Sequence, residues 1–199
     1  METTARTLGA YYTPRPLASL LIEWAIRSPE DSILDPSCGE GVFLTESVSR
    51  LLQLGIKPRN LGRQISGVDI DPRSLARAHG ALLSRHPALR WSQLIEGDFF
   101  VHARKAAGSV YFDAIVGNPP FIRNQGRSSY EKKFALETAK ASGVHLTGNA
   151  SLWAPFIASA LSFLRPGGRL AMIVPREAFF VQYARPLMQH LQTRFASTR

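Results

Sequence analysis

The chain of 199 residues is long enough for one domain or slightly more, and its hydrophobic content of 45% excludes a disordered chain. Lysine and arginine outnumber aspartate and glutamate by 24 to 15, so the formal charge is +9, which favours a polyanionic partner such as nucleic acid. The single cysteine, Cys38, excludes an intrachain disulfide and a cysteine-rich zinc site. No apolar run approaches the roughly 18 residues of a membrane span, and the start lacks the apolar stretch of a signal peptide, so a cytoplasmic location is expected.

The first predicted element is a helix that begins at Thr13 and Pro14. Thr13 can cap a helix, and Pro14 suits the first helical position. The apolar face of this helix is expected to consist of Leu17, Leu20, Leu21 and Trp24.

The rest of the chain alternates short apolar runs, typical of buried strands, with amphipathic stretches, typical of helices. Strands are predicted at residues 32–36, 64–71, 92–98, 112–117 and 169–174. Helices are predicted after the loop 37–41, with Phe43, Leu44, Val48, Leu51 and Leu52 facing inward, and at residues 72–85, 151–164 and 181–195. This alternation predicts an α/β fold with a doubly wound parallel sheet that carries helices on both faces.

Polar residues stand at or near the carboxyl ends of four predicted strands: Asp35, Asp69, Asp98 and Asn118. Ligands of such sheets bind at this edge, so the four side chains are expected to face one site.

The loop that follows the first strand holds Gly39 and Gly41, which allow the backbone to approach a ligand closely. The third glycine of the dinucleotide fingerprint is replaced by Leu44, which disfavours a nicotinamide or flavin cofactor. The nearby acidic residues suit a ligand that carries positive charge. Asp69 can accept both hydroxyls of a ribose, while Asp71, directly before Pro72, is assigned to the cap of the next helix.

Two aromatic residues follow Asp98. Asp98 can accept a hydrogen bond from an exocyclic amine and Phe99 can stack on a purine, whereas Phe100 is assigned to the core.

The motif Asn118-Pro119-Pro120-Phe121 directly follows the fourth strand. The two prolines stiffen the loop and restrict Asn118 to extended geometry. A side-chain amide oxygen and a backbone carbonyl oxygen can then point the same way and hold a planar amino group. Phe121 offers a flat surface for an aromatic ring. A plain proline-rich turn explains these flanking residues poorly.

The stretch 122–150 is polar, and a short helix is expected around residues 130–141. Its cationic residues are Arg123, Arg127, Lys132, Lys133 and Lys140. They fit either a solvated surface or a segment that contacts phosphates, and the position directly after Asn118 favours the second interpretation.

Taken together, these motifs resemble the N6-adenine DNA methyltransferases of restriction-modification systems, in the class where cofactor motifs precede the catalytic motif and target recognition. The segments that carry the resemblance are Gly9-Ala-Tyr-Tyr-Thr-Pro14, residues 35–44, Val68-Asp-Ile-Asp-Pro72, Gly97-Asp-Phe99, Asn118-Pro-Pro-Phe121, Leu152-Trp-Ala-Pro-Phe156 and residues 164–175.

The resemblance implies a class I S-adenosylmethionine-dependent, Rossmann-like fold and S-adenosyl-L-methionine as cofactor. It places Tyr11, Thr13, Asp35, Ser37 and Gly39 around the methionine part. It assigns Asp69 to the ribose, Ile70, Asp98 and Phe99 to the cofactor's adenine, and Phe156 to the pocket wall. The implied catalytic residues are Asn118, Pro119, Pro120 and Phe121, acting on an adenine flipped out of double-stranded DNA. No metal is expected.

The family's sheet has two more strands than the chain provides, and a target-recognition domain usually follows. Residues 1–199 are therefore expected to be one cofactor-binding and catalytic domain that is incomplete at its carboxyl end. Besides double-stranded DNA, the expected partners are a restriction endonuclease or the missing carboxyl-terminal recognition region. Three alternatives stay open: methylation of RNA bases, methylation of a protein glutamine amide, and a non-catalytic nucleic-acid-binding remnant of the fold.

Overall fold

The computed structural model describes residues 12–87, 93–106, 108–121 and 128–198. Its centre is one sheet of five parallel strands in the order β3-β2-β1-β4-β5. The strands are β1 (Ile33–Asp35), β2 (Ile65–Asp69), β3 (Leu94–Glu96), β4 (Phe112–Gly117) and β5 (Leu164–Met172). The predicted parallel sheet is confirmed.

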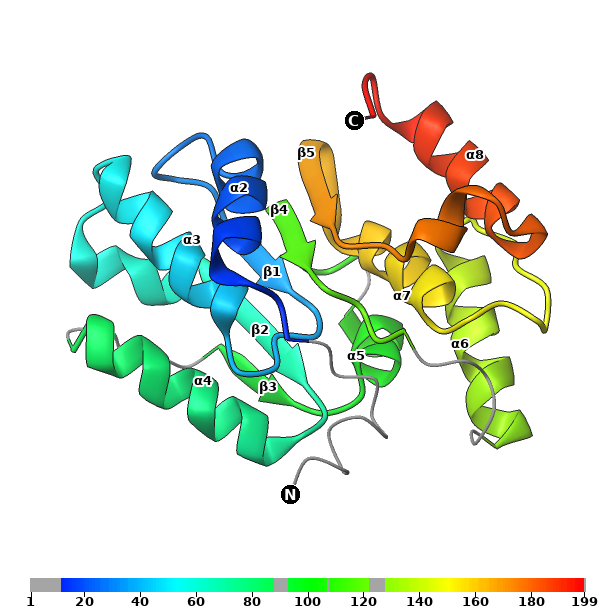
Figure 1. The fold of residues 1–199 in the computed structure, drawn as a ribbon, viewed down its shortest axis with the longest axis horizontal. Helices are drawn as coiled ribbons and strands as arrows, with labels where there is room; N and C mark the ends of the chain where they lie inside the picture. The colour runs from blue at the N-terminus through cyan, green and yellow to red at the C-terminus, as the bar shows by residue number, and fades with distance from the viewer. Residues whose placement is uncertain (1–11, 88–92, 107, 122–127, 199) are drawn as a thin grey trace.

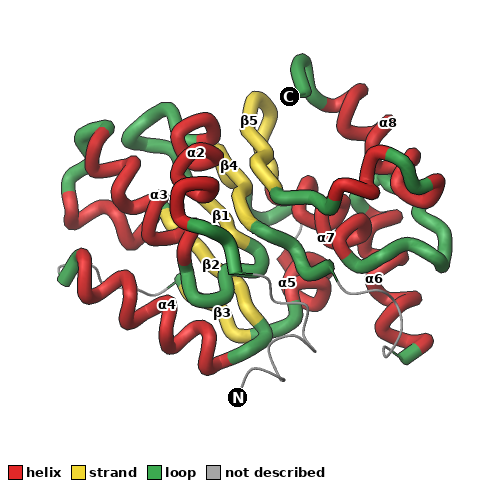
Figure 2. Tube along the Cα trace, in the orientation of Figure 1, coloured by secondary structure: helices red, strands yellow, loops and turns green. Residues whose placement is uncertain are grey.

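Helices cover both faces of this sheet (Figure 1, Figure 2). They are α2 (Arg15–Ala25), α3 (Val42–Gln53), α4 (Pro72–Arg85), α5 (Phe99–Ala106), α6 (Ser129–Ala141), α7 (Trp153–Ala160) and α8 (Arg185–Arg194). Short 3₁₀ turns are η1 (Pro58–Arg63), η2 (Leu161–Phe163), η3 (Arg176–Phe179) and η4 (Gln182–Ala184). In the described part of the chain, no helix has the length and apolar character to cross a membrane.

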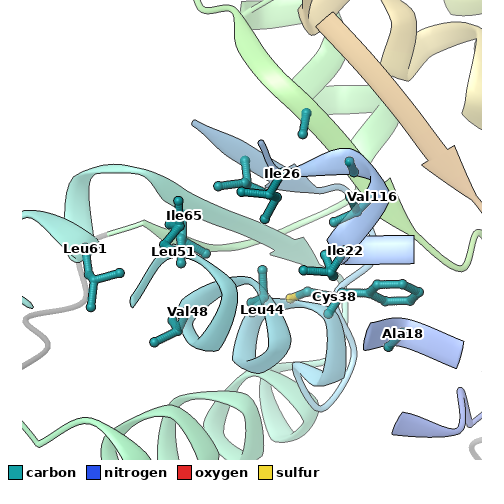
Figure 3. Packing of buried hydrophobic residues seen from close by; sticks show 14 of the residues in the cluster. Ala18, Ile22, Ile26, Cys38, Leu44, Val48, Leu51, Leu61, Ile65 and Val116 are labelled. Atoms are coloured by element: carbon teal, nitrogen blue, oxygen red, sulfur yellow. The ribbon is translucent and has the colours of Figure 1, made fainter. Parts of the chain in front are cut away.

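Two cores lie on the two faces of the sheet. One joins α2, α3 and α4 to the strands, and Figure 3 shows Ile22, Cys38 and Leu44 converging in it. The other joins α5, α6 and α7, with Phe99, Phe156 and Phe163 buried. A sheet with an apolar layer on each face is the arrangement that the near-continuous apolar strands demand.

Helix α2 differs from its prediction in its start and in its buried face. Its N-cap is Pro14, with no side-chain cap bond, so Thr13 does not cap it. The buried residues are Ala18, Ile22 and Ala25, whereas Leu17 and Leu20 are 40% and 64% exposed. The predicted face is therefore correct for Leu21 and Trp24, which are half-buried against the core, and wrong for Leu17 and Leu20. The small side chains of Ala18 and Ala25 form the closest contact because they let α2 approach the sheet and α3.

Strand β5 begins earlier than predicted. Phe112 pairs with Leu164 and Ala114 with Arg169, so residues 165–168 form an irregularity between the two registers. The Arg-Pro-Gly-Gly turn is thus absorbed into the strand as a bulge. Arg165, the first residue of this bulge, forms an ion pair with Asp113, and Arg169, directly after the bulge, forms one with Asp31.

The remaining helix predictions agree with the structure, apart from the ends of two helices. The inward residues predicted for α3 are buried or half-buried, and α6 lies where the short helix was expected, begun by a capping box of Ser128 and Glu131. Helix α7 gives way to η2 after Ala160, earlier than predicted. The last helix, α8, starts at Arg185, later than predicted, because Pro186 suits only its first turn.

Candidate functional site

The carboxyl ends of β2, β1 and β4 are neighbours in the sheet, and they bring Asp69, Asp35 and Asn118 to one edge. Asp98 follows β3, the next strand outward. The predicted polar edge of the sheet is therefore present, and its four side chains differ in burial and in hydrogen-bond partners.

Asp35 is a buried carboxyl, with no exposed surface. Its Oδ1 accepts a hydrogen bond from the Ser37 N–H at 3.1 Å, and its Oδ2 has no hydrogen-bond partner among the residues that the structure describes. Burial raises the pKa of Asp35 to about 8; the Ser37 hydrogen bond lowers it and the negative charge of Asp69 raises it further. A buried acceptor in this state is typical of a ligand site.

Gly117, the last residue of β4, provides the space for this carboxyl. A Cβ at position 117 would lie 2.7 Å from Asp35 Oδ1, closer than any side chain permits. A side chain at position 117 would therefore displace the Asp35 carboxyl, a constraint that the sequence motif alone does not reveal.

Asp69 holds the glycine loop. Its Oδ2 accepts from the Gly39 N–H at 2.7 Å and its Oδ1 from the Asp71 N–H at 2.9 Å. Each carboxylate oxygen has a further lone pair, so these bonds leave room for ligand hydroxyls. Ile70, directly after Asp69, is 53% exposed and offers an apolar surface next to it.

The loop ends where α3 begins, at Gly41. This residue has a φ of 82°, and a Cβ on it would lie 2.9 Å from the Cβ of Ala78 in α4. Asp71 caps α4 by accepting from the Arg73 N–H, as predicted.

Asp98 caps the start of α5, since its Oδ1 accepts from the Phe100 N–H at 2.7 Å. The Phe100 side chain is buried in the core, as predicted. The Phe99 ring is also buried, with its centroid 4.8 Å from that of Phe156, which is itself 4% exposed. Both rings thus belong to the core beneath the site rather than to its open surface.

Asn118 is held at two atoms. Its side-chain Nδ2 donates to Thr13 Oγ1 at 3.1 Å, and its backbone oxygen accepts from Ser37 Oγ at 3.1 Å. Pro119 is buried and Pro120 is half-buried. Phe121 is partly buried against a third apolar cluster, which α6 and α7 form with Ala178, Ala184 and Leu187. Sequence reasoning missed the Thr13 contact, because the pair is 105 residues apart.

Cationic side chains line an open hollow of about 460 Å³ along α6. They include Lys132, Lys133 and Lys140, and His145 also lines the hollow. Glu137 lies 3.9 Å from Lys133 and 3.9 Å from Arg104. Tyr11, Arg123 and Arg127, which the sequence assigned to the cofactor and nucleic-acid sites, lie outside the described residues.

Known proteins resemble this chain in sequence and in fold. The type II methyltransferase M.HincII of Haemophilus influenzae is 27% identical over 190 residues, covering 96% of this chain and 32% of its own length. M.BstVI of Geobacillus stearothermophilus is 26% identical over 196 residues, covering 84% and 33%. The chain thus spans about one third of the length of these relatives.

Solved structures share the fold. The methyltransferase subunit of a type I restriction-modification system from Streptococcus thermophilus superposes with a TM-score of 0.70 at 18% identity, covering 92% of this chain and 38% of that one. The type ISP restriction-modification enzyme LlaGI gives a TM-score of 0.74 at 18% identity, covering 94% and 22%. The fold is that of class I S-adenosylmethionine-dependent methyltransferases.

The family model described as N-6 DNA Methylase matches residues 1–186, which include every strand of the sheet and the whole polar edge. The chain belongs to the N-6 DNA methylase family.

Proposed function

We propose that this chain is the cofactor-binding and catalytic part of a site-specific DNA adenine-N6 methyltransferase that uses S-adenosyl-L-methionine. The observation that carries the proposal is Asn118, held by Thr13 and Ser37 at the end of β4 and flanked by Asp35 and Asp69 on the next strands. Membership of the N-6 DNA methylase family and relatives named type II methyltransferases support the same reaction.

The residues at the edge fit the cofactor. The Oδ2 atom of Asp35, buried and without a partner among the described residues, suits the ammonium group of the methionine part. The lone pairs that remain on Asp69 suit the two ribose hydroxyls, and the exposed side chain of Ile70 suits one face of the adenine. The other residues proposed around the cofactor are Tyr11, Thr13, Ser37, Gly39 and Asp98, and the buried rings of Phe99 and Phe156 support the site from the core beneath it.

The proposed chemistry relies on positioning. The cofactor supplies an electrophilic methyl group. The side-chain oxygen of Asn118 and the carbonyl of Pro119 accept from the N6 amine of the target, which turns its lone pair toward that methyl group. Phe121 stacks on the base, which must leave the duplex because its N6 atom is otherwise hidden. The methyl–sulfur bond would break as the nitrogen–methyl bond forms, and its electron pair would stay on the sulfur. Asn118 is no proton base, so the amine proton would pass to solvent late or after transfer. The rate comes from orientation and from acceptors aimed at a nitrogen that becomes positive.

Double-stranded DNA is the proposed partner of the cationic surface. Lys132 and Lys133 stand on α6, directly after the segment that carries Arg123 and Arg127. Contacts of this kind supply affinity for the phosphate backbone and no sequence preference. One relative is named as a combined restriction enzyme and methyltransferase, which supports a nuclease as a further partner.

Equilibrium binding of tritium-labelled S-adenosylmethionine tests the cofactor site. The wild-type chain should bind, Asp69→Ala should not, and Asp71→Ala should still bind because Asp71 caps α4. Equal binding by the wild type and Asp69→Ala, or none by either, would favour the inert nucleic-acid-binding alternative.

Transfer of the labelled methyl group tests the substrate. With the chain in excess over double-stranded DNA, digestion of the DNA should yield labelled N6-methyladenine, and Asn118→Ala should abolish this label while retaining cofactor affinity. Label that enters only RNA, or only a glutamine amide of a protein, would contradict the DNA assignment and favour one of the other two methyltransferase alternatives.

A further inference from the structure

The side chain of Asn118 can present either an acceptor or a donor to a target amine, depending on how its amide is turned. We propose that Thr13 is a positioning residue that fixes this orientation, an inference whose catalytic meaning rests on the function proposed above. The contact concerned is the 3.1 Å hydrogen bond from Asn118 Nδ2 to Thr13 Oγ1.

The position of Thr13 suits this contact with Asn118, whereas the sequence suggested that Thr13 caps helix α2. It is 4% exposed and precedes α2, but α2 has Pro14 as its N-cap and no side-chain cap bond. The hydroxyl that could have capped the helix is instead directed at Asn118.

The orientation matters because the two ends of a primary amide differ. The nitrogen carries two donors and the oxygen accepts, so a half-turn of the amide exchanges them. With Nδ2 bonded to Thr13, Oδ1 lies on the other side of the amide group. The reversed amide would present N–H groups to the target amine, and donors facing donors make no hydrogen bond.

Ser37 completes the positioning at the backbone of Asn118. Its Oγ donates to the Asn118 carbonyl oxygen at 3.1 Å, so the peptide that leads into Pro119 is held as well. The two contacts come from different parts of the chain, one before α2 and one after β1. Together they fix the side chain and the main chain of Asn118 before any target arrives, which is the preorganisation that a positioning mechanism requires.

Proton exchange of the Asn118 side-chain amide tests the contact in the 199-residue chain itself. The sequence has four asparagines, Asn60, Asn118, Asn124 and Asn149, so ¹⁵N-asparagine labelling gives few side-chain signals, and Asn118→Asp identifies the relevant pair. In the wild type, one Asn118 amide proton should exchange more slowly than those of the exposed Asn60 and Asn149. Thr13→Val keeps the shape, removes the acceptor, and should speed this exchange by about tenfold.

Thr13→Ser keeps the hydroxyl and should restore slow exchange, which separates loss of the acceptor from a general effect of substitution. Circular dichroism checks that each variant is folded; if Thr13→Val does not fold, Thr13→Ala takes its place with the same expectation. Exchange that is unchanged in the folded variant, or that is already as fast in the wild type as at Asn149, would overturn the proposal.

Cofactor binding and methyl transfer by the same variants separate this proposal from the proposed function. Thr13→Val should lower the rate of transfer at saturating cofactor, and Thr13→Ser should restore that rate. An unchanged transfer rate at saturating cofactor, with only the dissociation constant raised, would limit Thr13 to cofactor binding and overturn the positioning role. A wild-type chain that binds no cofactor would refute the proposed function, whereas the exchange result would still decide the Thr13 contact.

Discussion

Gly117 lies directly against the carboxyl group of Asp35. A methyl group at position 117 would lie 2.7 Å from Asp35 Oδ1, and the sulfur of Met172 on β5 is the next side-chain atom beyond this carboxyl, at 3.7 Å. Gly117, the last residue of β4, therefore determines the position that the carboxyl group of Asp35, at the end of β1, can occupy. This relationship links the proposed cofactor acid to the proposed catalytic motif, since Asn118 follows Gly117.

Gly117→Ala should displace the Asp35 carboxyl and weaken cofactor binding. The overpacking is expected to lower the free energy of unfolding by about 1–3 kcal/mol, measured by urea denaturation. Gly80→Ala is the matched control, because nothing lies within 4 Å of a Cβ at that position of α4. The control should bind cofactor normally and gain up to about 1 kcal/mol from the better helix propensity of alanine. Equal behaviour of the two variants would count against the close contact.

The pKa of Asp35, raised to about 8 by burial, predicts that stability depends on pH. The unfolded chain releases this proton near its ordinary pKa of 3.8, whereas the folded chain keeps it until about pH 8. The folded state therefore binds more protons in this window, and its stability relative to the unfolded state should fall as the pH rises through it. Asp35→Asn should remove this component of the pH dependence, measured as the difference in urea midpoints between the two proteins.

Cofactor affinity should show the opposite trend. An ammonium group binds the ionised carboxylate, so affinity for S-adenosylmethionine should rise from about pH 6 to about pH 8, by up to about tenfold per pH unit. Calorimetric titration at several pH values in buffers of different ionisation enthalpy would also detect the proton that Asp35 releases. An affinity that is flat with pH in the wild type would contradict the assignment of Asp35 to the ammonium group.

The sheet and its polar edge could be predicted from the sequence, because apolar strands and the polar residues at their ends are visible in short contiguous stretches of the chain. The same reasoning assigned Asp71 correctly to the cap of α4. It assigned Thr13 to a helix cap, because the true partner, Asn118, is distant in sequence and no local pattern reveals it.

The buried face of α2 could be predicted only in part, for a related reason. Of the four large residues that were predicted to face inward, Leu21 and Trp24 pack against the core, whereas Leu17 and Leu20 are exposed. The face with Ala18 is buried because the sheet and α3 come close to it, which is a property of the packed fold.

Asp69 combines a proposed ligand contact with a structural one, and its variants should separate the two. Asp69→Ala removes the acceptor for the Gly39 and Asp71 N–H groups and should destabilise the chain by about 1–3 kcal/mol besides abolishing cofactor binding. Asp69→Asn keeps one side-chain oxygen and should lose less stability. If Asp69→Ala loses cofactor affinity with no change in stability, the bonds to the glycine loop are energetically unimportant.

Cys38 should be unreactive in the folded chain. Its side chain is 4% exposed, and burial together with the charges of Asp35 and Asp69 raises the pKa of its thiol. Because the thiolate is the reactive form, labelling by iodoacetamide should be slow without denaturant and should accelerate in the urea range where the chain unfolds. Ser109→Cys provides an exposed thiol that should label at once. Rapid labelling of Cys38 in the folded wild type would contradict its burial.

The cationic surface on α6 should account for a measurable part of the salt dependence of DNA binding. Each phosphate contact adds about 0.9 to the slope of log affinity against log salt, so Lys132→Glu with Lys133→Glu should lower that slope by about 2 and weaken binding to any sequence alike. Lys57→Glu with Arg59→Glu is the control with the same change in charge, because both residues are exposed and stand at η1, which leads into the amino end of β2, at the opposite edge of the sheet. Cofactor affinity should not change in either protein. If the control lowers the slope as much as the α6 variant, DNA binding depends on net charge alone and the phosphate contacts do not lie on α6.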